Sequence, residues 1–254
     1  MSTVFQKNKI TEPALFSPCD TTEKITDFPK ICVSTFSENI IQKFASLDGA
    51  KKIAELYTAN GAVPVYRFCY KGVDIAFYLS RVGAPACVSG FEEIVAMGAE
   101  KFVLFGSCGV LDDEKVRDRI VIPVSAVRDE GTSYHYVPAS PEIQAEESGV
   151  RVLEGVLQNS RIPYVKGKTW TSDAIYRETL PLIEERKADG CIVVEMECAS
   201  MLAVAKYRNI PFVQFLYGAD CLGTETWEIR DLTDFGLTNA DKYMLLAFEC
   251  GIQM

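Results

Sequence analysis

The feature that most constrains this fold is a repeated alternation of short apolar segments and amphipathic segments. The segments 101–111 (KFVLFGSCGVL) and 119–127 (RIVIPVSAV) have the length and the β-branched and aromatic content of buried strands. The segment 86–100 (ACVSGFEEIVAMGAE) is typical of a helix, with Pro85 suited to the first turn and Gly98 to the end. Such alternation predicts an α/β fold, with helices flanking a mostly parallel sheet.

The alternation continues along the chain without a low-complexity linker or an obvious internal repeat. The 254 residues, 48% of them apolar, are enough for one large core, so we expect a single domain over residues 1–254. In such sheets, ligands gather where the strands deliver their carboxyl ends. The remaining segments are expected as a strand running into a Gly-Ala-Pro turn at 73–85, strands at 164–176 and 210–220, a strand running into a helix at 190–209, and a terminal helix near 239–251.

Composition argues against several classes of protein. No apolar stretch approaches the ~18–20 residues of a membrane span, and the start, MSTVFQKNKITEPALF, lacks the apolar core of a signal peptide, so we expect a cytoplasmic protein without a membrane partner. The formal charge of −9 opposes binding to nucleic acid. Nine cysteines without a Cys-x-x-Cys pair fit buried free thiols better than disulfides or a metal site, so no metal is expected.

Two glutamates, Glu195 and Glu197, follow an apolar run in the stretch VVEMECASM. Carboxylates are rarely buried without a partner or a task. They could favour the first turn of a helix over 197–208 through its macrodipole. They could also lie at the carboxyl end of the strand and accept hydrogen bonds from adjacent hydroxyls of a sugar. Spacing alone leaves both interpretations open.

A glycine-flanked stretch, Gly106-Ser107-Cys108-Gly109, predicts a turn that could aim backbone N–H groups at an oxyanion. The same pattern is typical of an ordinary tight turn, and neither a P-loop nor a Gly-x-Gly-x-x-Gly fingerprint is present. His135 is the only histidine and lies in a polar loop, as surface hydrogen-bonding histidines do. No Gly-x-Ser-x-Gly elbow supplies a serine nucleophile for it.

The segment VVEMECASMLAVAKYRNIPFVQFLYGAD resembles the Glu-Met-Glu-x-Ala segment of the nucleoside phosphorylase and nucleosidase superfamily, which includes uridine phosphorylases and hexameric purine nucleoside phosphorylases. VGAPACVSGFEEIVAMGAEKFVLFGSCGVL resembles its Gly-x-Pro turn, Glu-Glu helix and Gly-Ser/Thr-x-Gly turn, and VIPVSAVRDEGTSYHY and TSDAIYRE follow in the family's order. The resemblance runs from about residue 29 to the terminal helix and leaves 1–28 as an N-terminal extension. It implies a single α/β domain with a twisted, partly barrel-like central sheet, in a homo-oligomer (hexamer or dimer) whose neighbours complete each active site.

The resemblance also implies roles for the sugar and base contacts. Glu197 matches the residue that accepts hydrogen bonds from ribose hydroxyls, Met196 matches the one that packs on the sugar, and Glu195 is expected to support them. Cleavage of an N-glycosidic bond passes through an oxocarbenium-like sugar, so precise placement of the sugar accelerates it. Ser107, Cys108 and Gly109 match the family's turn that borders the phosphate and the base. Tyr176 falls in the stretch that forms a wall of the base pocket.

The identity of the base follows from two comparisons with the family. Thr179 and Pro181 stand where uridine phosphorylases carry a Gln-x-Arg pair, so uracil recognition is unsupported. Asp220 matches the purine-branch aspartate that protonates or hydrogen-bonds purine N7, and burial can raise the pKa of a carboxyl enough for it to donate. An aspartate that caps a turn is the alternative. Trp227 is expected to cover the base.

The phosphate loop departs from the family's pattern. STFSEN (34–39) replaces the usual Gly-Asp-Pro-x-Arg, which puts Thr35 at the glycine and Asn39 at the arginine, and Leu104 replaces a second arginine. No N-terminal histidine of the family's kind is present. Because arginine forks and backbone N–H groups normally hold a phosphate dianion, ordinary phosphorolysis is in doubt.

A substitute phosphate site is predicted from Arg81, Gly83 and Ser107, with Arg67 as a weaker candidate. The leading hypothesis is phosphorolysis of a purine nucleoside to base and ribose 1-phosphate, with inorganic phosphate as co-substrate and no cofactor. The alternatives are a nucleosidase that uses water, a uridine phosphorylase, and a nucleoside-binding protein whose catalysis has decayed.

Overall fold

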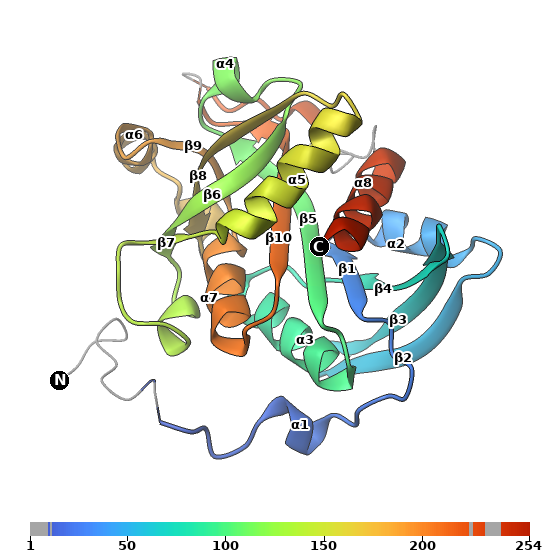
Figure 1. Ribbon diagram of the computed structural model, residues 1–254. Coiled ribbons are helices and arrows are strands. Elements are labelled where there is room, and N and C mark those ends of the chain that lie inside the picture. The colour runs from blue at the N-terminus through green and yellow to red at the C-terminus, as the bar shows by residue number, and fades with distance from the viewer. Residues whose placement is uncertain (1–9, 11, 224–225, 232–239) are drawn as a thin grey trace.

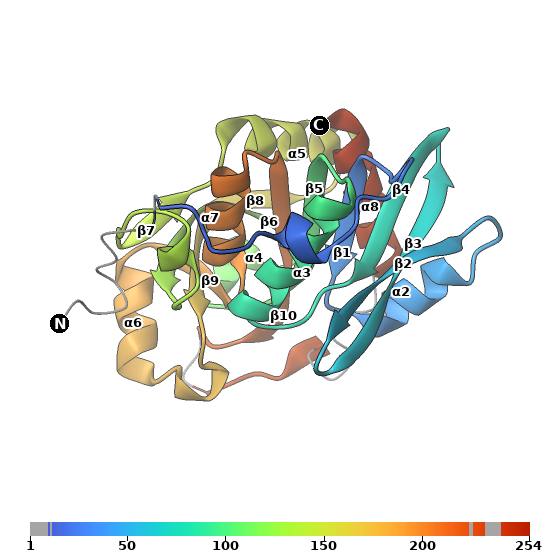
Figure 2. The same cartoon turned by 90° about the horizontal axis from the view of Figure 1, so that it is seen from below.

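A computed structural model describes residues 10, 12–223, 226–231 and 240–254. One continuous sheet runs through this part of the chain, with helices on both of its faces (Figures 1 and 2). Its strands are β1 (Ile31–Thr35), β2 (Lys51–Thr58), β3 (Gly61–Tyr70), β4 (Val73–Leu79), β5 (Lys101–Val110), β6 (Ile120–Asp129), β7 (Glu142–Gln144), β8 (Tyr164–Ser172), β9 (Cys191–Glu195) and β10 (Phe212–Cys221). The α-helices are α1 (Pro18–Thr21), α2 (Glu38–Ala45), α3 (Ala84–Met97), α4 (Asp113–Val116), α5 (Glu147–Asn159), α6 (Leu180–Ala188), α7 (Cys198–Arg208) and α8 (Ala240–Gln253); η1 (Ser133–His135) and η2 (Ile175–Arg177) are 3₁₀ turns.

Five of the strands close into a barrel. The order β10-β6-β8-β9-β5 is completed by a further pairing between β5 and β10. Parallel ladders join β5 to β10, β6 to β8 and β8 to β9, while β6–β10 and β5–β9 are short antiparallel contacts. From β5 the sheet continues through β1 and β4, both parallel, into the antiparallel strands β3 and β2. The predicted fold, an α/β arrangement with a twisted and partly barrel-like sheet, is confirmed.

Strand β5 shows why the central strands have nearly continuous apolar sequences. Phe102 and Leu104 belong to the core on the α3 and α7 side, whereas Val103 and Phe105 belong to the core on the α2, α5 and α8 side. Successive side chains of a strand point to opposite faces, and both faces are covered here. The sheet is therefore held from both sides, and its carboxyl-end residues are set on a rigid frame.

The ends of α3 match the sequence prediction. Pro85 lies in its first turn, and Gly98 ends it with φ 135°, a conformation that side chains with a β-carbon rarely adopt. The strands expected at 73–85, 119–127, 164–176 and 210–220 are present, as is the terminal helix. All nine cysteines are free thiols; seven are buried, as expected, whereas Cys19 and Cys69 are exposed.

The predicted turn at Gly106-Ser107-Cys108-Gly109 is wrong. These residues lie inside β5 and pair with β10 from Leu216 opposite Gly106 to Asp220 opposite Gly109. The glycines serve close packing instead: a β-carbon at position 109 would lie 2.5 Å from Leu222 Cδ1 and 2.9 Å from Val194 Cγ1. Glycine therefore lets neighbouring side chains approach the strand here, rather than reversing the chain.

The described residues lack two features that would bear on function: a membrane-spanning helix and a group of metal ligands. None of their helices is long and apolar enough to cross a membrane. Nor do any three His, Cys, Asp or Glu side chains among them gather in a group that could hold a metal ion.

Candidate active site

Glu195 is the last residue of β9, and its buried carboxylate accepts four hydrogen bonds. Oε1 accepts from the hydroxyls of Thr171 (2.6 Å) and Thr169 (3.3 Å) on β8. Oε2 accepts from the backbone N–H groups of Glu197 (2.7 Å) and Cys198 (2.6 Å) at the start of α7. The capping interpretation is therefore correct for Glu195, which ties two strands to the positive end of a helix.

Glu197 occupies the N-cap position of α7, but its side chain does not cap that helix. Its Oε1 instead accepts from the backbone N–H of Gly83, at 2.6 Å. Gly83 is the N-cap of α3 and has φ 98°, which a glycine adopts without strain. The Glu197 carboxyl is thus held, 5% exposed, between the first turns of two helices.

The two glutamates do not share a proton equally. Burial raises the pKa of both, and the carboxylate of Glu195 raises that of Glu197 further. Four hydrogen bonds stabilise ionised Glu195, whereas Glu197 is assisted by the N–H groups of Gly83 and Met196 and opposed by Asp173. The first proton that the pair takes up therefore belongs on Glu197, which becomes a carboxylate above its raised pKa.

Asp220 lies near the end of β10, just beyond a bulge that follows Gly218. It stands opposite Gly109, and a β-carbon on Gly109 would lie 3.5 Å from Asp220 Oδ1. The indole N–H of Trp227 donates to Asp220 Oδ2 at 2.7 Å. Burial raises the pKa of Asp220, and the bond from Trp227 partly offsets that effect.

The end of β5 brings the two carboxyl sites together. Gly109 pairs with Val194, directly before Glu195, and with Asp220 on the other side. Cys108 is buried, and its pKa is raised well above the usual value by burial and also by both Glu195 and Asp220. Its thiol donates to the Tyr217 carbonyl (3.4 Å), so its predicted contact with substrate stays a prediction.

The predicted cationic ligands have other partners. Arg81 Nη2 donates to the carbonyl of Gly61, the first residue of β3, at 2.7 Å. Arg67 donates to the Asp27 carbonyl at 2.5 Å and pairs with Asp74 at 3.2 Å. The phosphate role of Arg81 stays a prediction, and in this structure its guanidinium fastens a hairpin turn.

An aromatic ring lies beside β5 in the altered phosphate loop. Phe36 follows β1, and a β-carbon on Gly106 would lie 2.7 Å from Phe36 Cδ2. Asn39, in the first turn of α2, is exposed, and Leu104 is fully buried in the core. The positions that carry arginines in the family thus supply an exposed amide and a core side chain.

Other predicted contacts are less closely packed. Met196 and Ser107 are half-buried, whereas Tyr176 is 94% exposed and Trp227 is 56% exposed. Their roles toward a substrate stay predictions.

Sequence reasoning missed three residues near the two carboxyl sites. Thr169 and Thr171 hold Glu195, and their spacing of two in a strand could have placed them on one face. Glu178 follows η2, and burial together with nearby Asp220 raises its pKa to about 7. No pattern in the sequence connected Glu178 with Asp220.

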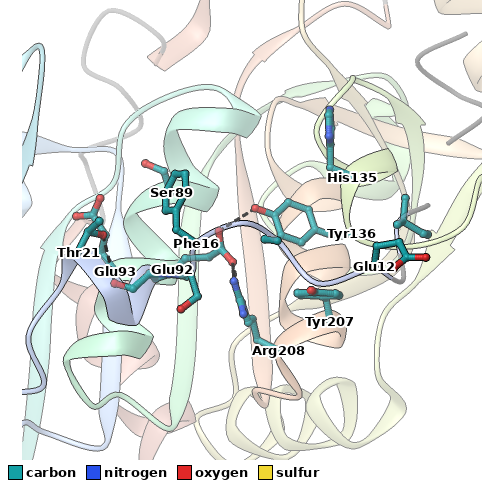
Figure 3. Close-up of a pocket in the computed structure, with 14 residues that line it drawn as sticks. Glu12, Phe16, Thr21, Ser89, Glu92, Glu93, His135, Tyr136, Tyr207 and Arg208 are labelled. Carbon is teal, nitrogen blue, oxygen red and sulfur yellow. Dashed lines mark hydrogen bonds and ion pairs between the residues drawn. The ribbon is translucent and has the colours of Figure 1, made fainter. Parts of the chain in front are cut away.

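A cavity of about 750 Å³ lies away from these residues, between the N-terminal segment, α3 and the end of α7 (Figure 3). Glu92 on its wall accepts from Tyr136 (2.8 Å) and from Arg208 Nε (2.7 Å). His135 lines the same cavity, and none of the predicted site residues does.

A family model described as the phosphorylase superfamily matches residues 30–247. The chain belongs to the phosphorylase superfamily. It is 26% identical over 161 residues to a guanosine phosphorylase of Halorubrum lacusprofundi (62% of this chain, 65% of the relative), and 28% identical over 144 residues to a purine nucleoside phosphorylase of Plasmodium vivax (56% and 59%). The matched stretch thus spans about three fifths of the length of these relatives. A uridine phosphorylase of Treponema pallidum matches at 22% over 224 residues, 84% of this chain and 83% of that protein.

Solved structures show the same fold. A uridine phosphorylase of Vibrio fischeri superposes with a TM-score of 0.76 at 19% identity, covering 91% of this chain and 95% of that one. An AMP nucleosidase of Bacteroides thetaiotaomicron gives a TM-score of 0.70 at 18% identity, covering 88% and 87%. This superfamily member thus shares its fold with proteins named for different substrates.

Proposed function

We propose that this protein is a purine nucleoside phosphorylase, which cleaves the N-glycosidic bond with phosphate and releases the base and ribose 1-phosphate. The observation that carries the proposal is the division of labour between the two glutamates. Glu195 is committed to four protein donors, so Glu197 is the carboxylate that can accept ribose hydroxyls. Its carboxylate is held by the Gly83 N–H at the junction of α3 and α7, and in this proposal it fixes the orientation of the sugar.

Asp220 is the proposed general acid for the base. Burial raises its pKa, which favours the protonated form that can donate to purine N7. It lies one strand away from the β9 end that carries Glu195, so a nucleoside could reach both carboxyl sites. The curated relatives named for guanosine and purine nucleosides support a purine, and Thr179 and Pro181 give no support to uracil.

In this proposal, phosphate attacks C1′ while the electron pair of the C1′–N9 bond moves to the protonated purine. Ser107, Gly83 and Arg81 are the proposed phosphate contacts. Arg81 would have to leave the Gly61 carbonyl to reach a phosphate.

A nucleosidase that uses water is the second candidate, and a specific observation favours it. The ring of Phe36 lies against Gly106, Arg81 is bonded to Gly61, and the N–H of Gly83 is bonded to Glu197. A phosphate dianion needs cationic groups and several N–H donors to hold its charge, whereas a neutral water molecule needs no cation.

We also propose a homo-oligomer. The segment 175–180 presents Ile175 (52% exposed), Tyr176 (94%) and Leu180 (62%) to solvent. Grouped exposed apolar side chains are typical of surfaces that meet a partner. Light scattering on the purified protein would measure its mass in solution.

Product analysis tests the proposal. The purified protein is incubated with inosine, guanosine, adenosine and uridine, with and without phosphate, and the base and sugar products are separated by liquid chromatography. We expect purine release that requires phosphate and yields ribose 1-phosphate. Free ribose formed at a rate indifferent to phosphate would establish the nucleosidase, a preference for uridine would reject the purine assignment, and no cleavage would leave a binding protein.

A further inference from the structure

Trp227 is fixed beside Asp220 by a short hairpin. Cys221 and Glu228 exchange two backbone hydrogen bonds, of 2.9 and 3.0 Å. Arg230 fastens the hairpin base through Asp113 (2.8 Å) and Glu228 (3.0 Å). Backbone pairing and ion pairs therefore hold the indole in place, although its ring is more than half exposed.

The two oxygens of Asp220 have different surroundings. Oδ2 accepts the indole N–H at 2.7 Å. No side-chain donor in the described part of the chain is bonded to Oδ1, which lies 3.5 Å from where a β-carbon on Gly109 would stand, on the side of Asp220 that faces β5. A hydrogen-bond donor at Oδ2 favours the form in which Oδ2 is the acceptor and Oδ1 carries the proton.

We infer that Trp227 is a positioning residue for protonation of the leaving base: its N–H holds Oδ2, so the acidic proton sits on Oδ1, the oxygen that donates to purine N7. The inference rests on the proposed function, because it takes Asp220 as the acid. The proton passes from Oδ1 to N7 as the C1′–N9 electron pair moves to the purine, and a lone pair of the attacking phosphate oxygen forms the new bond to C1′. The remaining proton of the phosphate returns through solvent to Asp220. The indole N–H then stabilises the carboxylate left behind.

The charges around Asp220 fit this assignment. Trp227 and Arg230 lower its pKa against the effect of burial. Asp220 lies close enough to Glu178 to raise the pKa of that carboxyl, and the neutral thiol of Cys108 lies on the β5 side. Removing the indole N–H takes away a group that stabilises the carboxylate, so it raises the pKa of Asp220.

The test compares Trp227→Phe, which keeps a ring without the N–H, with Trp227→His, which keeps a ring N–H. The control is Ile229→Val, an exposed side chain in the same hairpin. The kcat of each variant is measured against pH for inosine and for p-nitrophenyl riboside, whose leaving group needs no proton. We expect W227F to cleave inosine about tenfold more slowly, with the basic limb of its profile moved to higher pH and its KM little changed. Cleavage of p-nitrophenyl riboside should be unaffected, and W227H should recover most of the lost rate.

Asp220→Asn, measured in the same series, separates the failure of this inference from the failure of the proposed function. If D220N loses inosine cleavage while W227F keeps the wild-type rate and basic limb, the positioning role is wrong and the acid role stands. Equal losses of W227F on both substrates, or a loss confined to KM, would mean that Trp227 only covers the substrate. If D220N cleaves inosine normally, the acid assignment itself fails and the inference fails with it.

Discussion

The sugar side and the phosphate side of the proposed site are built in opposite ways. On the sugar side, Glu195 accepts four hydrogen bonds and Glu197 is tied to a second helix by Gly83. On the phosphate side, Phe36 lies against Gly106, and Arg81 is bonded to a hairpin carbonyl. The proposed sugar carboxylates are therefore held in place by hydrogen bonds, whereas two of the proposed phosphate ligands, Arg81 and Gly83, are bonded to other groups of the protein.

The largest effect on stability is expected from Glu195→Ala, which removes the carboxylate that holds the sugar side of the proposed site together. The change leaves two threonine hydroxyls and two backbone N–H groups without their acceptor in a buried place. We expect the free energy of unfolding to fall by about 3–5 kcal/mol, because breaking a buried charged network is costly. Chemical denaturation of the variant measures it, and a loss below about 1 kcal/mol would show that Glu195 is not the support.

Glu197→Gln should affect turnover instead of stability. Its carboxylate is proposed to accept ribose hydroxyls, and losing a charge-assisted hydrogen bond costs about 1.5–3 kcal/mol, or roughly ten- to a hundredfold in rate. We expect a melting temperature close to that of the wild type. A near-wild-type rate combined with a lower melting temperature would make Glu197 a structural residue like Glu195. The proposal that Glu197 binds the ribose would then be wrong.

Gly106→Ala probes the phosphate side through its packing. The new methyl group would lie 2.7 Å from Phe36 Cδ2, so the ring must move. We expect a loss of about 1–3 kcal/mol in unfolding free energy, as for overpacked cores. Phe36→Leu in the same chain should restore most of it, and a double variant no more stable than G106A would mean that the ring is not the obstacle.

The pH dependence of stability reports the proton on the glutamate pair. In the folded state the pKa of Glu197 is raised, so between about pH 4.3, where an unfolded glutamate ionises, and that higher pKa the folded state binds more protons than the unfolded state. Stability therefore falls as pH rises through this window, by at most about 1.4 kcal/mol per pH unit for one proton. Denaturation at a series of pH values should show this slope, and it should flatten in Glu197→Gln. An equal slope in that variant would place the proton elsewhere.

The sequence predicted the helices and strands better than the contacts of the candidate site, for physical reasons. Apolar runs and helix caps are local, so the strands and α3 were predicted correctly. The glycines of β5 were interpreted as a turn because nothing local shows that β9 and β10 pair on either side.

Side-chain partners were harder to predict because they come from distant segments. The donors to Glu195 and Glu197 include Thr171 and Gly83, so the spacing of the two glutamates could not assign their roles. The partner of Arg81 is the backbone carbonyl of Gly61, twenty residues earlier. Every residue carries such a carbonyl, so no sequence pattern marks this one as the acceptor.

Arg81→Ala has the smallest expected effect on stability and sharpens the comparison most directly. Its bond to Gly61 lies at the surface, so its loss should cost under about 1 kcal/mol. If the guanidinium leaves that carbonyl to hold phosphate, the half-saturating phosphate concentration should rise about tenfold, because a charge-assisted bond of about 1.4 kcal/mol is lost, while KM for the nucleoside changes little. Arg81→Lys keeps the positive charge but loses the two-pronged guanidinium, so its half-saturating phosphate concentration should lie between those of the wild type and R81A. A phosphate dependence unchanged in R81A would assign Arg81 to the hairpin alone. If the wild-type protein cleaves the nucleoside at full rate in phosphate-free buffer, phosphate is not the nucleophile. Phe36, beside Gly106, would then border the site of an attacking water molecule.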